Sequence, residues 1–157
     1  MNQGQEIFCF KMDNQRYGFP LHCVDRFLQA TAVKPVPNSP PLIHGLIDYY
    51  GNLIPVINFR HRVKLPEKRI RVSDYFVIVE THKRKLAIVI DDVEDVIVPS
   101  AKDIIQASSL DRNLDNMGFL RRDDGIIFIY DLETFFSNGE EEIMQGIIDK
   151  AQQDLAH

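Results

Sequence analysis

The pair Asp91-Asp92 is the feature of this sequence that comes nearest to a catalytic motif. It follows the apolar run 86–90, and paired aspartates after a buried strand are typical of a Mg²⁺-dependent phospho-accepting site. A doubly wound fold would need a helix of about ten residues after these acids. The sequence continues instead with Val93, Val96 and Val98, a pattern closer to a strand. We therefore expect Asp91 and Asp92 to form a solvated strand end.

The other residue types that support chemistry lack the spacing that the chemistry requires. The five histidines do not form a metal-binding pair on one helix or within one hairpin. Gly45 and Gly51 bracket five residues, but no Lys-Ser/Thr follows them as in a phosphate-binding loop. We therefore predict no catalytic residue, no metal site and no cofactor. A binding module is favoured; a small-molecule-binding barrel or an enzyme with an unrecognised site is the alternative from another class.

Composition limits the partners and the compartment. The chain of 157 residues suits one domain or two small joined ones, and its net charge of −5 argues against nucleic-acid binding. No apolar stretch approaches the roughly 20 residues of a membrane span, so no membrane insertion is expected. With two cysteines and no signal peptide at the N-terminus, a cytoplasmic location is the default.

The sequence contains two blocks that recur in the same order. The first block recurs at an offset of 69 residues, pairing Gly18, Phe19, Leu21, Val24 and Phe27 with Ala87, Ile88, Ile90, Val93 and Val96. The second recurs at an offset of 73, pairing Gly45, Leu46, Ile47, Ile54, Val56, Asn58 and Phe59 with Gly118, Phe119, Leu120, Ile127, Ile129, Asp131 and Leu132. An insertion between the blocks explains the four extra residues, because loops tolerate insertions. This duplication predicts two similar small subdomains that share apolar contacts.

Strand patterns dominate the local signals. Alternating or continuous apolar runs bounded by turn residues predict strands at 7–12, 16–21, 53–57, 75–80, 86–90, 93–98 and 126–130. A helical turn is expected over 41–44, a short helix capped by Asn58 over 58–62, and an irregular loop over 100–116. An apolar stripe with a four-residue period predicts an amphipathic helix over 140–155. This helix either covers the core of one subdomain or binds a partner.

The segment 43–60 resembles the signature of the CheW adaptor family. That family reads Gly-aliphatic-aliphatic-Asn-x-Arg-Gly, then Pro-Val-aliphatic-Asp-Leu-Arg, and residues 17–24 and 87–96 are similar to its flanking strands. The resemblance spans 6–137. It implies an all-β fold of two small five-stranded SH3-like barrels, roughly 14–70 and 75–137. Whether the two barrels share the strand before residue 14 is left open. A C-terminal amphipathic helix would form a tail at 138–157.

The resemblance also implies a function. Such proteins are non-catalytic scaffolds that join the cytoplasmic tips of chemoreceptors to the regulatory domain of the CheA-type histidine kinase in bacterial chemosensory signalling. The resemblance leaves open whether the cytoplasmic protein is recruited to membrane-bound receptor arrays. The alternative is a divergent CheW-like regulator whose binding to receptor or kinase is lost or altered.

Three departures from the family pattern fall near the expected binding loop. Tyr50 stands where the family has arginine, Asp48 where it has asparagine, and Arg26 where relatives usually carry glutamate. An exchange of this kind removes both ends of a charge pair and favours retuned partner specificity. The candidate partner-binding residues are Val24, Arg26, Phe27, Asp48, Tyr50 and Leu53. Core packing is the alternative for Val24 and Phe27, because their repeat equivalents look buried.

Overall fold

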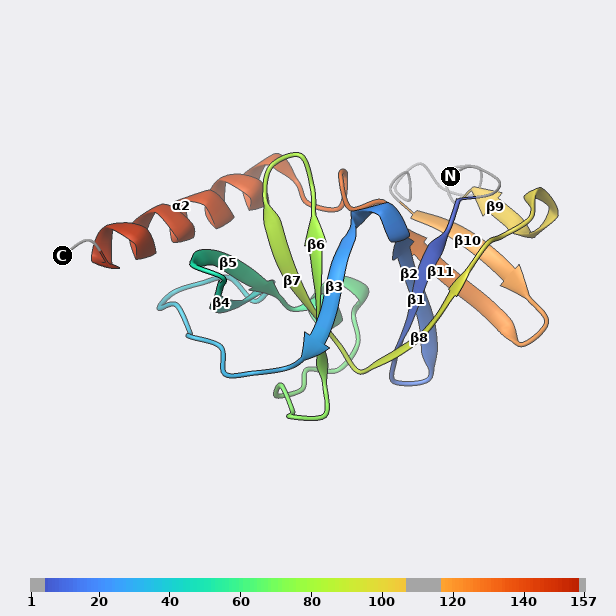
Figure 1. The fold of residues 1–157 in the computed structure, drawn as a ribbon, viewed down its shortest axis with the longest axis horizontal. Helices are drawn as coiled ribbons and strands as arrows, with labels where there is room; N and C mark the ends of the chain where they lie inside the picture. The colour runs from blue at the N-terminus through green and yellow to red at the C-terminus, as the bar shows by residue number, and fades with distance from the viewer. Residues whose placement is uncertain (1–4, 107–116, 156–157) are drawn as a thin grey trace.

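A computed structural model describes residues 5–106 and 117–155 as two sheets lying side by side, with a helix extending from one end (Figure 1). The first sheet has the strand order β8-β1-β2-β11-β10-β9, and the second β3-β6-β7-β5-β4. Each sheet forms a small SH3-like barrel, which confirms the predicted all-β fold; the short β9 adds a sixth strand to the first barrel.

The strands are β1 (Ile7–Met12), β2 (Gln15–Pro20), β3 (Val24–Gln29), β4 (Ile43–Tyr49), β5 (Asn52–Ile57), β6 (Tyr75–Glu80), β7 (Lys85–Ile90), β8 (Asp92–Ile97), β9 (Ile104–Gln106), β10 (Met117–Arg122) and β11 (Gly125–Tyr130). The helices are α1 (Phe59–Val63) and α2 (Asn138–Leu155), with 3₁₀ turns at Leu21–Cys23 and Ala101–Asp103.

Strand register supports the internal duplication. In the β1–β2 hairpin Phe8 lies opposite Phe19, and in the β6–β7 hairpin Val77 lies opposite Ile88. Both members of the second pair follow the first by 69 residues, the offset found in the sequence. The two hairpins are therefore the same structural unit used twice.

The repeats exchange their first hairpins. Hairpin β1–β2 comes from the first repeat but lies in the sheet of β8, β10 and β11, with Gly18 opposite Ile129 in a parallel pair. Hairpin β6–β7 lies in the sheet of β3, β4 and β5, with Ala87 opposite Val56 in the equivalent pair. Each barrel thus contains strands from both repeats, which links the two barrels through the chain itself.

A shared aromatic and aliphatic core lies between the barrels. Along β1, Ile7 and Cys9 pack inside the first barrel, whereas Phe8 and Phe10 face the shared core, as the two-residue period of a strand requires. Phe59 of α1 is fully buried in that core and contacts Phe10 edge to face at 5.4 Å between ring centroids. The barrels are therefore held together by apolar burial.

A buried ion-pair cluster crosses the same junction. The guanidinium of Arg60, a residue only 7% exposed, donates to Asp13 Oδ1 at 2.8 Å and to Asp91 Oδ2 at 2.7 Å. This hydrogen bond holds the pKa of Asp13 below its usual range. The prediction for Asp91 was wrong: it is not a solvated strand end, because it neutralises a buried arginine. Asp92, by contrast, is exposed.

Two local predictions were wrong and two are confirmed. Residues 43 and 44 begin strand β4 instead of ending a helical turn, and 104–106 form β9 within the expected loop 100–116; residues 107–116 lie outside the described part. Helix α1 begins after Asn58, whose side chain accepts from the His61 backbone N–H at 3.2 Å. The predicted C-terminal helix is also present as α2.

Helix α2 is anchored at its beginning and extends beyond the body at its end (Figure 1). Met144 and Ile148 are buried, and Arg62 and Arg84 form ion pairs with Glu140 and Glu141. The beginning of α2 therefore covers the core, the first of the two roles that the sequence left open. No helix in the described part of the chain is long and apolar enough to cross a membrane.

Candidate protein–protein interface

Arg26 of β3 and Tyr50 of the β4–β5 turn meet at one corner of the second barrel. Arg26 Nη1 donates to Tyr50 Oη at 3.0 Å, and its guanidinium carbon lies 5.4 Å from the centroid of that ring. Strands β3 and β4 are the outer strands of the second sheet, so this contact joins its two edges. Two of the three positions that depart from the family pattern are thus in direct contact, and they form a cation–π pair in place of the charge pair that the family pattern implies.

Three further side chains hold this corner in place. Tyr49, only 8% exposed, donates from its hydroxyl to Asp25 Oδ2 at 3.0 Å. Lys85 Nζ lies 3.3 Å from the same carboxylate oxygen. The tyrosine hydroxyl, followed by the lysine, holds the pKa of Asp25 below its usual range. We refer to Asp25, Arg26, Tyr49, Tyr50 and Lys85 as the Arg26 corner.

The turn presents Tyr50 to solvent in an unfavourable backbone conformation. Tyr50 and Gly51 form a two-residue loop with φ of 50° and 87°, the positive values of a type I′ hairpin. Asp48 Oδ1 accepts from the Gly51 backbone N–H at 2.8 Å and closes the loop. A left-handed conformation costs a non-glycine residue about 1–2 kcal/mol. Tyr50 is nevertheless 77% exposed, so burial does not compensate for this strain, and strain of this kind is often found at functional sites.

Four of the six predicted contact residues are exposed and two are half-buried. Arg26, Phe27, Asp48 and Tyr50 are exposed, whereas Val24 and Leu53 are half-buried. Val24 packs against the shared core, which favours its structural interpretation. The structure brings Arg26, Asp48 and Tyr50 together at the corner. Leu53 lies opposite Asp48 in the β4–β5 pairing.

Phe27 belongs to an apolar strip beside the corner. It is 49% exposed, and its ring centroid lies 6.0 Å from that of Phe8. Val96, its repeat equivalent, is 47% exposed and lies opposite Phe8 in the β1–β8 pairing. Phe27 and Val96 therefore flank Phe8 where the barrels meet, and we call these three residues the apolar strip.

Sequence reasoning missed Asp25, Tyr49 and Lys85. Asp25 and Tyr49 are 24 residues apart and Asp25 and Lys85 are 60 apart, so no local pattern pairs them. The available signal was the repeat itself, because Lys85 is the equivalent of Arg16 and Asp25 the equivalent of Glu94.

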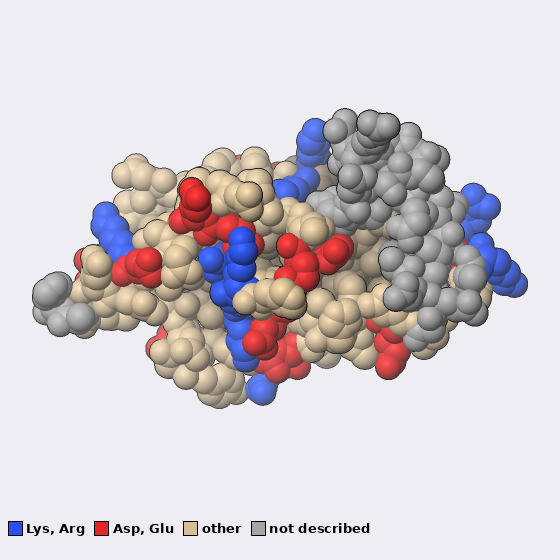
Figure 2. All heavy atoms as spheres, turned by 90° about the horizontal axis from the view of Figure 1, so that it is seen from above, with Lys and Arg blue, Asp and Glu red and all other residues tan. Residues whose placement is uncertain are grey.

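Charged side chains elsewhere on the surface are mixed in sign. On the face shown in Figure 2, lysine and arginine side chains form a narrow central column with aspartate and glutamate on both sides. The ion pairs Arg62–Glu140 and Arg84–Glu141 likewise bring opposite charges together at the beginning of α2.

Known proteins resemble the chain over nearly its whole length. The model of the CheW-like domain matches residues 6–140. The chain is 23% identical to the chemotaxis protein CheW of Rhizobium meliloti over 145 residues, covering 90% of this chain and 93% of that protein. It is 25% identical to the chemotaxis protein CheW of Treponema pallidum over 142 residues, covering 86% and 84%. The crystal structure of the scaffolding protein TtCheW from Thermoanaerobacter tengcongensis superposes with a TM-score of 0.76 at 25% identity, covering 88% of this chain and 97% of that one.

Proposed function

Because this chain belongs to the CheW-like family of chemotaxis scaffold proteins, we propose that it joins the cytoplasmic tips of chemoreceptors to the regulatory domain of a CheA-type histidine kinase. The family is one of non-enzymatic adaptors, and we extend that property to this chain. The alternative of a regulator that has lost array binding is not favoured, because the relatives named as chemotaxis proteins align with most of the chain.

The observation that carries this proposal is the exposed Arg26 corner. A 77% exposed tyrosine in a strained backbone conformation and an exposed arginine both pack against Tyr49, whose hydroxyl donates to Asp25. Tyrosine and arginine are the residue types that most often dominate protein–protein binding energy. We assign the kinase regulatory domain to this corner and the receptor tip to the apolar strip, so that residues 6–137 act as the adaptor domain and 138–157 as its tail. The protein would work in the cytoplasm and be recruited to membrane-bound receptor arrays through the receptors.

The departures from the family pattern at the Arg26 corner change the specificity for the partner. Arg26 carries a positive charge where relatives usually carry a negative one, so a cognate partner should present an acidic or aromatic group there. Charge complementarity excludes wrong partners as much as it attracts the right one.

Titration calorimetry of the purified protein against the regulatory domain of its own organism's CheA-type kinase tests the proposal. We expect saturable binding at micromolar concentration or tighter, about −8 kcal/mol. An absence of binding to the kinase domain and to the receptor tip would contradict it.

A further inference from the structure

A second surface feature lies at the opposite end of β4 from the Arg26 corner. An open crevice of about 1020 Å³ separates segment 31–35, in which Lys34 forms an isolated β-bridge with Leu46, from the connector 67–70, and His44 of β4 is among its lining residues. The connector leads from α1 to β6 and is fixed on both sides. Before it, Pro66 accepts from Arg60 through its carbonyl oxygen; after it, the Asp74 side chain accepts from the Arg71 backbone N–H.

The walls of this crevice carry unused backbone hydrogen-bonding groups. Lys34 exchanges both of its backbone hydrogen bonds with Leu46 of β4, each at 2.9 Å. Because backbone groups alternate in direction along an extended chain, those of Val33 point away from β4. Within the described residues, the backbone N–H groups of Val33, Lys68 and Arg69 donate no hydrogen bond. These segments are therefore open to pairing with another extended chain.

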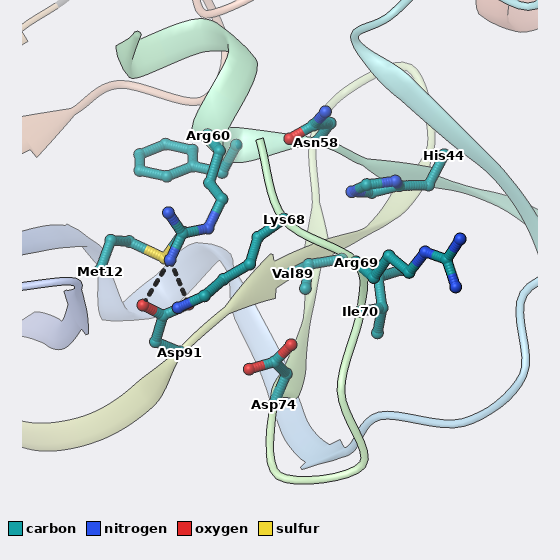
Figure 3. A pocket seen from close by; sticks show the side chains of 11 residues that line it. Met12, His44, Asn58, Arg60, Lys68, Arg69, Ile70, Asp74, Val89 and Asp91 are labelled. Atoms are coloured by element: carbon teal, nitrogen blue, oxygen red, sulfur yellow. Dashed lines mark hydrogen bonds and ion pairs between the residues drawn. The ribbon is translucent and has the colours of Figure 1, made fainter. Parts of the chain in front are cut away.

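The rim is predominantly basic although the protein is acidic overall. Arg69 is exposed and forms no ion pair within the described part of the chain, and Lys68 Nζ is only loosely paired with Asp13 at 3.8 Å. Glu67 is the acidic residue of the lining, and burial lowers the pKa of His44, which favours its neutral form. The side chains of Lys68 and Arg69 point in opposite directions, one toward the Arg60–Asp91 pair and the other outward (Figure 3).

The crevice also offers an apolar surface. Val33 and Ile70 are half-buried and pack against the core of the second barrel from its two sides. A smaller hollow lined by His44, Lys68 and Ile70 continues beneath the connector as far as Arg60 and Asp91 (Figure 3). The crevice thus leads from the surface toward the ion pair that joins the barrels.

We propose that this crevice binds an extended acidic segment of a partner protein by strand addition between 31–35 and 67–70. Its carboxylates pair with Arg69 on one face of the added strand, and its alternate aliphatic side chains contact Val33 and Ile70 on the other, since alternate residues of a strand face the same side. The site is separate from the Arg26 corner and does not depend on the function proposed for that corner.

Fluorescence anisotropy tests this with a labelled octapeptide, Glu-Val-Glu-Ile-Asp-Val-Glu-Ser, and the full-length chain. We expect saturable binding that Arg69→Glu weakens at least about tenfold. Arg121→Glu is the matched control, because Arg121 is exposed on β10 and undergoes the same charge change. Hydrogen exchange should show slower exchange of the backbone amides of Val33, Lys68 and Arg69 when the peptide is bound.

Four results would overturn the proposal. These are no saturable binding up to about 1 mM peptide, equal weakening by Arg69→Glu and Arg121→Glu, and undiminished binding of a peptide N-methylated at alternate amides. The fourth is displacement of the peptide by inorganic phosphate at constant ionic strength, which would assign the crevice to a small anion.

Discussion

The Arg26 corner has a counterpart in the first barrel that is built from equivalent positions. There Arg16, the repeat equivalent of Lys85, lies with its Nε 3.1 Å from Glu94 Oε1, and Glu94 is the equivalent of Asp25. Arg16 also pairs with Asp95 and Asp124, each at 3.3 Å. We call these four residues the Arg16 corner. The same contact between a base and an acid is thus present in both barrels. It joins β2 to β8 in the first barrel and β7 to β3 in the second.

The corners differ in what surrounds the shared contact. Arg26 is the equivalent of Asp95 and Tyr50 the equivalent of Asp123, so one copy has a cation and an aromatic ring where the other has two acids. At the Arg16 corner the acids surround an arginine whose side chain is 16% exposed and satisfy it internally. At the Arg26 corner the ring of Tyr50 remains exposed. The structural contact is thus present in both barrels, whereas the exposed aromatic ring is present at one of the two corners.

Reversing the chemistry of the Arg26 corner should have the largest effect. Arg26→Glu combined with Tyr50→Arg should weaken binding to the kinase regulatory domain about 30-fold, near 2 kcal/mol, because it removes an exposed tyrosine and inverts the charge. The control is Asp95→Lys, the corresponding change at the Arg16 corner, which should leave affinity unchanged. Calorimetric affinities that are equal for all three proteins would remove the functional distinction between the corners.

Replacing the basic residue of each corner with alanine should show how much each corner contributes to stability. Arg16→Ala should lower the free energy of unfolding by about 1 kcal/mol, because it leaves neighbouring carboxylates without a partner. Lys85→Ala should cost about 0.5 kcal/mol or less, since it breaks one more exposed pair. Urea unfolding of both variants measures this, and a larger loss for Lys85→Ala would reverse our ranking.

Relieving the turn should have opposite effects on stability and binding. Tyr50→Asn places the preferred Asn-Gly pair in a type I′ turn and should stabilise the protein by about 0.5 kcal/mol while weakening partner binding. Asp123→Asn is the matched control, because Asp123 does not adopt a positive φ. Loss of both stability and affinity in Tyr50→Asn would indicate that Tyr50 supports the fold instead.

The smallest expected effect is a pH dependence at Asp25. Its pKa is lowered in the folded state, so its contribution is fully present above the unfolded value of about 4 and is lost as the pH falls through the folded value. The stability difference between the native protein and Asp25→Asn should therefore shrink as the pH falls from 5 to the acid limit of folding. The decrease should follow the titration curve of a single carboxyl group. Thermal unfolding across this range measures it; a constant difference would exclude Asp25 as the titrating anchor.

Local sequence patterns predicted the hairpins β1–β2 and β6–β7 but not the strands β3, β4 and β10. Strand β4 begins within the range 41–44, where the sequence predicted a helical turn after two prolines. In the structure Gly45 has φ of 153°, and a Cβ there would lie 2.2 Å from the Lys34 carbonyl oxygen. The glycine therefore serves a close approach of two chains at a bulge in β4 and does not end the strand.

The family pattern identified Arg26 and Tyr50 as coupled positions, and the structure brings them into contact. Their anchors Asp25 and Lys85, and the exchange of hairpins between repeats, depend on pairings between distant residues that no local signal encodes. The repeat offset was the one sequence feature that carried long-range information, because it recurs in the strand register.

The proposed function requires one molecule of this protein to hold two partners at once. Size-exclusion chromatography of the kinase regulatory domain with a receptor-tip fragment, with and without this protein, tests it most directly. We predict that the two partners elute in one ternary complex when the protein is present and separately when it is absent. If the partners instead compete for the protein, so that each displaces the other, the account of two separate faces is contradicted.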